Sequence, residues 1–285
     1  MSHCEVGGQA VIEGVMMRSP NHLVISVRNE DGKIVTKKER IRRMKKPFRL
    51  PFIRGIISLV DALVMGIKAL TWSANQATGI DEEIKGKDIA FVIGVSFLFG
   101  ILFFIALPLY LTKLITVDKG VIFNIIDGVI RIGIFVAYIL AISLMKDVRR
   151  IFQYHGAEHK AVNCYENNET LKVKNVKKYS TLHPRCGTAF LVIVLIISII
   201  LFSIIITDSL LTRFVARIIL IPVVAGISFE FLKFAGTYRH NWFIKILSAP
   251  GLSIQKITTK EPDKAQMEVA ITALKATLAL ERKQG

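Results

Sequence analysis

The sequence predicts a membrane α-helical bundle of about four transmembrane helices, with a small cytoplasmic β-containing N-terminal part and a C-terminal amphipathic helix. Two stretches without a charged residue, 89–112 and 186–207, each exceed the roughly 18 apolar residues that mark a membrane span. The 38 Lys and Arg residues lie mostly on one side of the expected spans, as in a membrane protein of fixed orientation. Residues 1–50, by contrast, are polar and strand-like.

The composition excludes several other classes of protein. The chain has 285 residues, of which 52% are hydrophobic and 21% are charged, and the apolar residues are concentrated in runs. This distribution rules out an ordinary soluble globule and a disordered chain. The three cysteines, Cys4, Cys164 and Cys186, form an odd and sparse set, which rules out a disulfide-stapled secreted domain.

Residues 1–54 are predicted to form a cytoplasmic, β-rich and basic N-terminal segment. An Asp31-Gly32 pair lies between the β-rich runs 22–28 and 33–36, which is typical of a hairpin, and residues 7–18 are expected to supply another strand. Residues 37–54 carry nine Lys and Arg. We interpret this run as a solvated loop beside a membrane surface that attracts anionic lipid, in preference to a nucleic-acid patch.

Residues 55–88 are predicted to form an interfacial, amphipathic helical segment, because their apolar helical pattern is interrupted by Asp61 and Lys68. Two transmembrane hairpins follow, separated by a polar segment. Their boundaries are 89–145, with spans at about 89–112 and 120–145, and 188–232, with spans at about 188–207 and 214–232.

The two remaining segments are polar. Residues 146–187 are expected to form a cytoplasmic loop that carries the His and Cys motifs, and residues 233–285 a cytoplasmic C-terminal segment. In the latter, Met267, Ile271 and Leu274 recur at helical spacing with Leu278. This helix is expected to pack against the cytoplasmic part.

The distribution of basic residues predicts the orientation. Of the 38 Lys and Arg, 33 fall on the side of the termini and of the central loop, and Arg131 lies inside a span. The four on the opposite side are Lys113, Lys119, Arg213 and Arg217. By the positive-inside rule, the protein is expected in the cytoplasmic (inner) membrane as a multi-pass protein with both termini cytoplasmic. The expected partners are the lipid bilayer and anionic lipid at the cytoplasmic face, and nucleic acid is not favoured.

The sequence His155-Gly156-Ala157-Glu158-His159 is the strongest chemical signal. On a helix, His155 and His159 face the same way, as two imidazoles must to reach one tetrahedral ion. Glu158 is adjacent and could act as the catalytic general base or orient an imidazole. A divalent metal such as Zn²⁺ is therefore expected. The alternative is a cytosolic helix with two surface histidines.

A second group of possible ligands follows in the sequence. His183 and Cys186 are three residues apart beside a turn, a spacing compatible with zinc ligation. Glu230 lies among apolar residues near a cytoplasmic helix end, where an unpaired carboxylate is costly. It is expected either to join the metal ligands or to pair with Lys233 or Arg239. Cys164 is interpreted as a small buried hydrophobe.

Four segments resemble one family, the YqhQ-like bacterial multi-pass membrane proteins, a domain of unknown function labelled as predicted metal-dependent enzymes. The segments are GGQAVIEGVMMR at 7–18, YHGAEHKAVNCYE at 154–166, HPRCGT at 183–188 and EPDKAQMEVAITAL at 261–274. The resemblance implies a multi-pass inner-membrane protein and names no reaction.

Three functions are compatible with these features. The first is a metal-dependent, zinc-like hydrolase with its site on the cytoplasmic face. The second is a non-catalytic membrane scaffold or assembly factor with a structural metal site. The third is a small transporter, for which Asp127, Arg131 and Glu230 would line the pathway.

Overall fold

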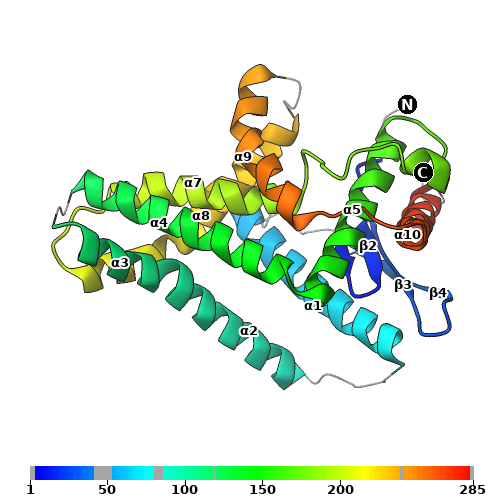
Figure 1. Ribbon diagram of the computed structural model, residues 1–285, viewed down its shortest axis with the longest axis horizontal. Helices are drawn as coiled ribbons and strands as arrows, with labels where there is room; N and C mark the ends of the chain where they lie inside the picture. The colour runs from blue at the N-terminus through cyan, green and yellow to red at the C-terminus, as the bar shows by residue number, and fades with distance from the viewer. Residues whose placement is uncertain (1–3, 42–52, 80–85, 118–119, 238–240, 283–285) are drawn as a thin grey trace.

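The computed structural model describes residues 4–41, 53–79, 86–117, 120–237 and 241–282. A long bundle of helices forms one end of the molecule, and a small sheet flanked by helices forms the other (Figure 1). Both the first described strand and the last helix lie at the end that holds the sheet (Figure 1). Most of the basic run at 37–54 lies outside the described residues.

The N-terminal part is an antiparallel four-stranded meander with the order β1-β2-β3-β4. Its strands are β1 (Gly7–Val11), β2 (Gly14–Arg18), β3 (His22–Arg28) and β4 (Ile34–Arg40). The predicted hairpin is confirmed, since β3 pairs with β4 and Gly32 has the positive φ of 77° that suits glycine in a tight turn.

Residues 7–18 form two strands, where the sequence indicated one. They turn at Ile12 and Glu13, and Glu13 has a φ of 51°, which is uncommon for a residue with a side chain. The next residue is Gly14, and a side chain does not fit there because a Cβ would lie 2.3 Å from the carbonyl oxygen of Ser26 on β3. An Ile-Glu pair is not a usual turn signal, so the second strand was missed.

Helices cover both faces of the sheet. Val15 and Met17 point to one face, which packs on α5 (Lys146–Glu166) and α10 (Lys264–Arg282). Met16 and Ile25 point to the other face, which packs on α1 (Ile53–Thr78). This alternation follows from the two-residue repeat of a strand. The predicted C-terminal helix is confirmed, and its Met267, Ile271 and Leu274 are buried.

The bundle consists of long apolar helices. Among the described residues, four helices are long and apolar enough to cross a membrane: Arg54–Thr78, Ala90–Ile115, Val121–Ser143 and Leu210–Ala235. The first lies in α1, the third is α4 (Val121–Ser143) and the fourth lies in α8 (Leu210–Thr237). The second runs without a break through α2 (Gly86–Ile101), the π-helical turn η2 (Leu102–Ala106) and α3 (Leu107–Ile115).

This set of candidate spans differs from the predicted one in two members. The helix over 55–77, interpreted from the sequence as interfacial, is long and apolar enough to qualify. The span expected at 188–207 corresponds to α7 (Gly187–Ser203), which is apolar but shorter. Two further helices, α6 (Val173–Val176) and α9 (Trp242–Thr258), lie outside the expected spans.

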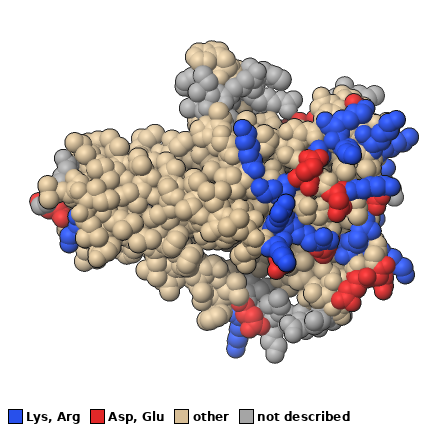
Figure 2. Space-filling model, in the orientation of Figure 1, with Lys and Arg blue, Asp and Glu red and all other residues tan. Residues whose placement is uncertain are grey.

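The outer surface of the bundle is apolar. Phe91 of α2 and Val129 of α4 are 72% and 65% exposed. Lys, Arg, Asp and Glu gather at the end that holds the sheet, α5 and α10, whereas the visible surface of the bundle is almost free of them (Figure 2). Large exposed apolar surfaces of this kind suit contact with a lipid bilayer.

Arg213 and Arg217, assigned from the sequence to the far side of the membrane, are buried within the bundle. Asp127 accepts hydrogen bonds from Arg131 at 2.5 Å and from Arg217 at 2.7 Å. The amide oxygen of Asn124 accepts from Arg213 at 3.2 Å and from Arg217 at 3.1 Å. Each of these side chains belongs to a residue that is no more than 3% exposed, so the network joins α4 to α8 in the interior.

Candidate metal centre

The helical interpretation of the His155–His159 motif is confirmed, because both histidines lie on α5. Gly156 lets another part of the chain approach this helix closely, since a Cβ there would lie 2.1 Å from the carbonyl oxygen of Lys260. Ala157 is fully buried against the sheet. The two small residues between the histidines therefore allow α5 to be enclosed on several sides while its imidazoles point toward a third segment.

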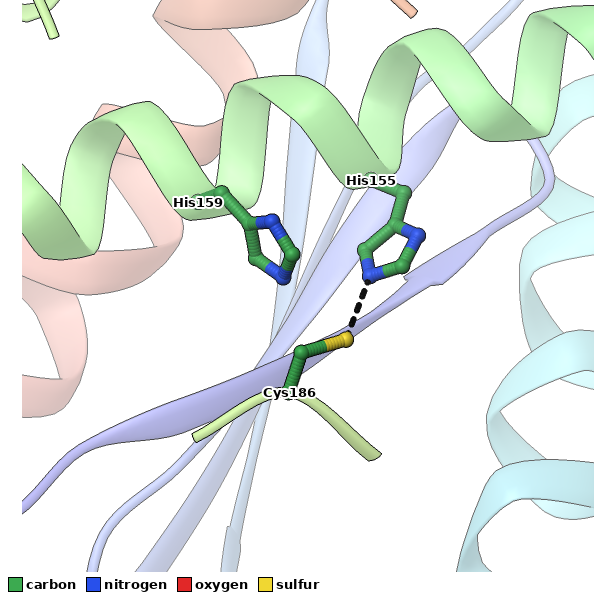
Figure 3. Close-up of side chains that lie close together, drawn as sticks. All are labelled: His155, His159 and Cys186. Carbon is green, nitrogen blue, oxygen red and sulfur yellow. Dashed lines mark hydrogen bonds between the residues drawn. The ribbon is translucent and has the colours of Figure 1, made fainter. Parts of the chain in front are cut away.

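That third segment carries Cys186. The Nε2 atom of His155 lies 3.2 Å from the Sγ atom of Cys186. The ring centroids of His155 and His159 are 4.4 Å apart. One ligand atom from each of His155, His159 and Cys186 lies within 4.8 Å of the others. Figure 3 shows both imidazoles pointing from α5 toward the cysteine sulfur.

Main-chain carbonyls fix the orientation of both imidazoles. The Nδ1 atom of His155 lies 2.9 Å from the carbonyl oxygen of Thr258, and that of His159 lies 2.5 Å from the carbonyl oxygen of Thr181. A carbonyl can only accept, so each Nδ1 is the donor. In a neutral imidazole this leaves the Nε2 lone pair free for a metal ion, as is usual for metal-ligating histidines.

Burial favours the neutral form of His159. It lowers the pKa of that imidazole, and the nearby His155 acts in the same direction, while contacts with Cys186 and with the carbonyl of Thr181 oppose the shift. A neutral imidazole is the form that binds metal. The tautomer and the protonation state of His159 therefore both suit a ligand.

Cys186 occupies the N-cap of α7. Its Sγ accepts a hydrogen bond from the backbone N–H of Thr188 at 3.4 Å and lies 3.1 Å from the hydroxyl oxygen of that residue. Backbone N–H groups at a helix N-terminus stabilise negative charge. Since the thiolate is the form of cysteine that binds metal, this position suits a ligand as well.

Glu158 is next to these ligands and is only 4% exposed. Burial raises the pKa of its carboxyl group, while His155, His183, the backbone N–H of Gly8 and Arg185 act in the opposite direction. Gly8 of β1 is close because it lacks a side chain: a Cβ there would lie 2.7 Å from Cγ of Glu158. The carboxylate is thus held between α5 and the edge strand of the sheet.

The ligands open onto a cavity of about 820 Å³. Its wall includes His155, Glu158, His159 and Cys186, and it extends past β1 and β2 to α1. The volume lies within the range of about 300–1,000 Å³ that is typical of small-molecule sites. A reactant could therefore reach the three ligands and the carboxylate together.

The structure does not bring all the predicted residues to this point. His183 is near, with its ring centroid 5.8 Å from that of His159, but its Nδ1 accepts a hydrogen bond from the backbone N–H of Arg185 at 3.3 Å and its Nε2 lies 3.4 Å from Oε1 of Glu166. Glu230 is not part of the group, because Arg54 holds its carboxylate, with Nε donating to Oε1 at 2.7 Å. Cys164 is a buried core residue, as expected.

The comparisons with known proteins place the chain in a family. The model of a family described as "Protein of unknown function (DUF1385)" matches residues 50–280. The chain belongs to this family. The DUF1385 match includes His155, His159 and Cys186, and it begins after the sheet.

One curated relative matches nearly the whole length. "Uncharacterized protein YqhQ" of Bacillus subtilis (strain 168) is 37% identical over 299 residues, which cover 96% of this chain and 92% of the relative. No solved structure matches the chain. The resemblance indicated by the four sequence segments is thereby confirmed.

Sequence reasoning missed two residues of the site, Gly8 and Arg18, both of which line the cavity. The available signal was the GGQAVIEGVMMR segment at 7–18, which carries part of the family resemblance although it contains no metal-ligand pattern. Its Gly8 makes room for Glu158, and its Glu13 forms an ion pair with Arg150, which lies five residues before His155 on α5.

Proposed function

We propose that the protein is an integral cytoplasmic-membrane metalloenzyme that hydrolyses its substrate at a zinc-like site on the cytoplasmic face. The observation that carries the proposal is the convergence of His155, His159 and Cys186 on one point, with both imidazoles oriented by main-chain carbonyls. Two nitrogens and one sulfur form a ligand set that suits zinc.

The donor chemistry fits a catalytic site better than a closed one. Catalytic zinc sites have three protein ligands and keep one position open, and the ion then acts as a Lewis acid and activates water for hydrolysis. The three ligands here line a cavity large enough for a reactant. Glu158 lines the same cavity and would accept a proton during the reaction, which is the role of a general base.

The position of the site relative to the membrane supports the proposed orientation. The charged side chains gather around the sheet, α5 and α10, where the candidate centre lies (Figure 2). Because basic residues are retained on the cytoplasmic side, we assign this end to the cytoplasm, together with both termini. Anionic lipid headgroups would face the basic residues of this end.

We propose that α1 lies along the membrane interface. Arg54 at its start pairs with Glu230 in the last third of α8, and Ser73 in its second half accepts a hydrogen bond from the backbone N–H of Ile12 at 3.1 Å. The helix therefore runs from the bundle to the sheet. Because α1 ends on the sheet, it does not carry the chain to the opposite side of the membrane.

A structural metal site is the second candidate. His183 favours it, because its ring centroid lies 5.8 Å from that of His159, and it would be a fourth protein ligand if its Nε2 gave up its present contact with Glu166 at 3.4 Å. With four ligands the ion would have no open position, and the protein would be a scaffold or assembly factor. The transporter alternative gains no support, since Asp127 and Arg131 are paired and buried.

The exchange of Glu158 for glutamine separates catalysis from structure. Purified, zinc-loaded protein and the Glu158→Gln variant would be incubated with a panel of carboxylic esters, amides and phosphoesters, with products detected by mass spectrometry. We expect equal zinc content but a turnover lowered by roughly 10²–10⁴, the usual contribution of a general base.

The matched control is Glu169→Gln, which makes the same change at an exposed residue just after the end of α5. It should leave turnover unchanged. Equal turnover in wild type and Glu158→Gln would exclude the base role. A zinc-bound protein that is inactive on the whole panel, with four protein ligands including His183, would support the structural candidate.

A further inference from the structure

We infer that the cavity binds a membrane amphiphile with an anionic headgroup, with Arg18 as the residue that recognises the headgroup. The inference names the substrate class for the site and in that respect rests on the proposed function. Its binding part depends only on the walls of the cavity, which differ sharply in chemistry from one part to another.

Arg18 provides an available positive charge. It ends β2, lies on the α1 side of the sheet with Met16, and lines the cavity. Within the described part of the chain its guanidinium forms no ion pair, whereas Arg185, the other arginine of the wall, is paired with Glu166. An unpaired guanidinium suits a phosphate or carboxylate, which it can bind through two parallel hydrogen bonds.

The acidic side chains of the wall do not cancel this charge. Glu158 is buried at the end with the candidate metal ligands, and Glu5 is exposed. The cavity thus combines a cationic group, a possible reaction centre and, between them, mostly apolar side chains such as Val6, Met16 and Val162. A small polar metabolite would leave the apolar surface unused.

The wall formed by α1 connects the cavity to the lipid-facing surface. Ala62 and Met65 line the cavity. On the same stretch of helix Val60 and Leu63 are each 54% exposed, and Val64 is 39% exposed. Apolar side chains therefore continue from the cavity onto the outside of a helix that is apolar enough to contact the bilayer. An acyl chain could lie along this surface while its headgroup reaches Arg18.

Photo-crosslinking tests this inference on the full-length protein in lipid nanodiscs. The probe is a phosphatidic acid with a diazirine in its acyl chain, and labelled peptides are mapped by mass spectrometry. We expect labelling on the α1 peptide that contains Ala62 and Met65. Arg18→Ala should reduce it by about tenfold or more, the effect of losing a hydrogen-bonded charge contact.

Matched variants and probes make the test specific. Lys33→Ala removes one positive charge from an exposed position in the turn between β3 and β4 and should leave labelling unchanged. Arg18→Lys should restore part of the labelling. Ala62→Trp should block the labelling, because the indole would occupy the part of the cavity that Ala62 lines. A diacylglycerol probe has the same acyl chain but no anionic headgroup. It should label the wild-type protein as weakly as the phosphatidic acid probe labels the Arg18→Ala variant.

The results can also overturn the inference. Equal labelling of α1 in wild type and Arg18→Ala, or no labelling of α1, would contradict it. Competition by inorganic phosphate as strong as that by unlabelled phosphatidic acid would show that the site takes the free anion. Zinc content, measured on the same samples, separates the two proposals: zinc without Arg18-dependent labelling refutes only the amphiphile, and labelling without zinc refutes only the metalloenzyme.

Discussion

Gly8 shows how closely the sheet fits against α5 at the candidate site. A Cβ at this position would lie 2.7 Å from Cγ of Glu158 and 2.8 Å from the carbonyl oxygen of Met16. Because the second neighbour is backbone, it cannot move away cheaply. We expect Gly8→Ala to destabilise the fold by about 1–3 kcal/mol, the usual cost of overpacking, and thermal unfolding of the purified protein measures this.

Gly7 offers a matched control for that substitution. It lies in the same strand, and a Cβ there would meet nothing within 4 Å. Gly7→Ala should therefore leave the melting temperature nearly unchanged. A Gly8→Ala variant as stable as Gly7→Ala would mean that β1 and Glu158 are farther apart than the structure has them.

Individual residues of the site were predictable to different degrees. His155 and His159 were, because helical spacing alone puts them on one face. Their partners Thr181 and Thr258 were not, since a main-chain carbonyl leaves no signature in the sequence. Glu230 was expected to join the metal ligands or to pair with Lys233 or with Arg239, which lies outside the described residues. The structure gives it Arg54, 176 residues away, as a partner, and the packing of α1 on α8 brings these two together.

At the scale of elements, Glu281 fastens the end of α10 to the start of β3. Its carboxylate accepts hydrogen bonds from the side chains of Ser19 and Asn21, and His22 lies 3.1 Å away. Burial opposes ionisation of the group, but these hydrogen bonds prevail and lower its pKa to about 2. The ionised carboxylate is thus the form that stabilises the docked helix.

The stability of this contact should depend on pH in a defined direction. The pKa of Glu281 in the folded protein, about 2, is lower than the unfolded value of about 4.3. Its contribution is therefore complete above about pH 4.5 and declines as the pH falls toward 2. We expect the melting temperature of Glu281→Gln to lie below that of wild type at neutral pH, with the difference shrinking on acidification.

Glu268→Gln is the control for this series, because Glu268 lies on the same helix and its side chain, paired with Arg28, is 43% exposed. Exposed pairs contribute little, so its difference from wild type should be small at every pH. A difference between Glu281→Gln and wild type that stayed constant from pH 7 to pH 3 would show that the charge of Glu281 is not what fastens α10.

Elements with a strong local signal were predictable, and those that depend on distant contacts were not. The turn at Asp31-Gly32 and the apolar repeat of α10 are local signals, and both are confirmed. The turn at Ile12 and Glu13 has no such signal. Glu13 is held there by Arg150 and by Tyr154, whose hydroxyl lies 3.1 Å from its carboxylate, and both partners belong to a helix far along the chain.

At the scale of the whole molecule, Asp127 joins two long helices of the bundle by accepting hydrogen bonds from Arg131 and Arg217. Removing one partner of a buried ion pair typically costs about 3–5 kcal/mol, because it leaves an uncompensated charge. We expect Asp127→Ala to lower stability by this amount, as measured by thermal unfolding in detergent. Asp147→Ala, at an exposed position on α5, should have little effect. Similar melting temperatures for the two variants would contradict a stabilising role for the network.

The overall arrangement was predictable because it follows from hydropathy and charge. Uncharged runs indicated long apolar helices, and the charged residues do gather at one end (Figure 2). The course of α1 was harder, because its composition suits both a span and an interfacial helix. Only its contacts with α8 and with the sheet show that it packs against both the bundle and the sheet.

Metal content and coordination test the central claim most directly. The claim is that His155, His159 and Cys186 hold one divalent ion. Elemental analysis of the purified protein should find about one zinc per chain, and X-ray absorption should show sulfur at about 2.3 Å and imidazole nitrogen at about 2.0–2.1 Å. His155→Ala combined with His159→Ala should abolish binding. Absence of stoichiometric metal from wild type after zinc loading, or unchanged binding in the double variant, would contradict the claim.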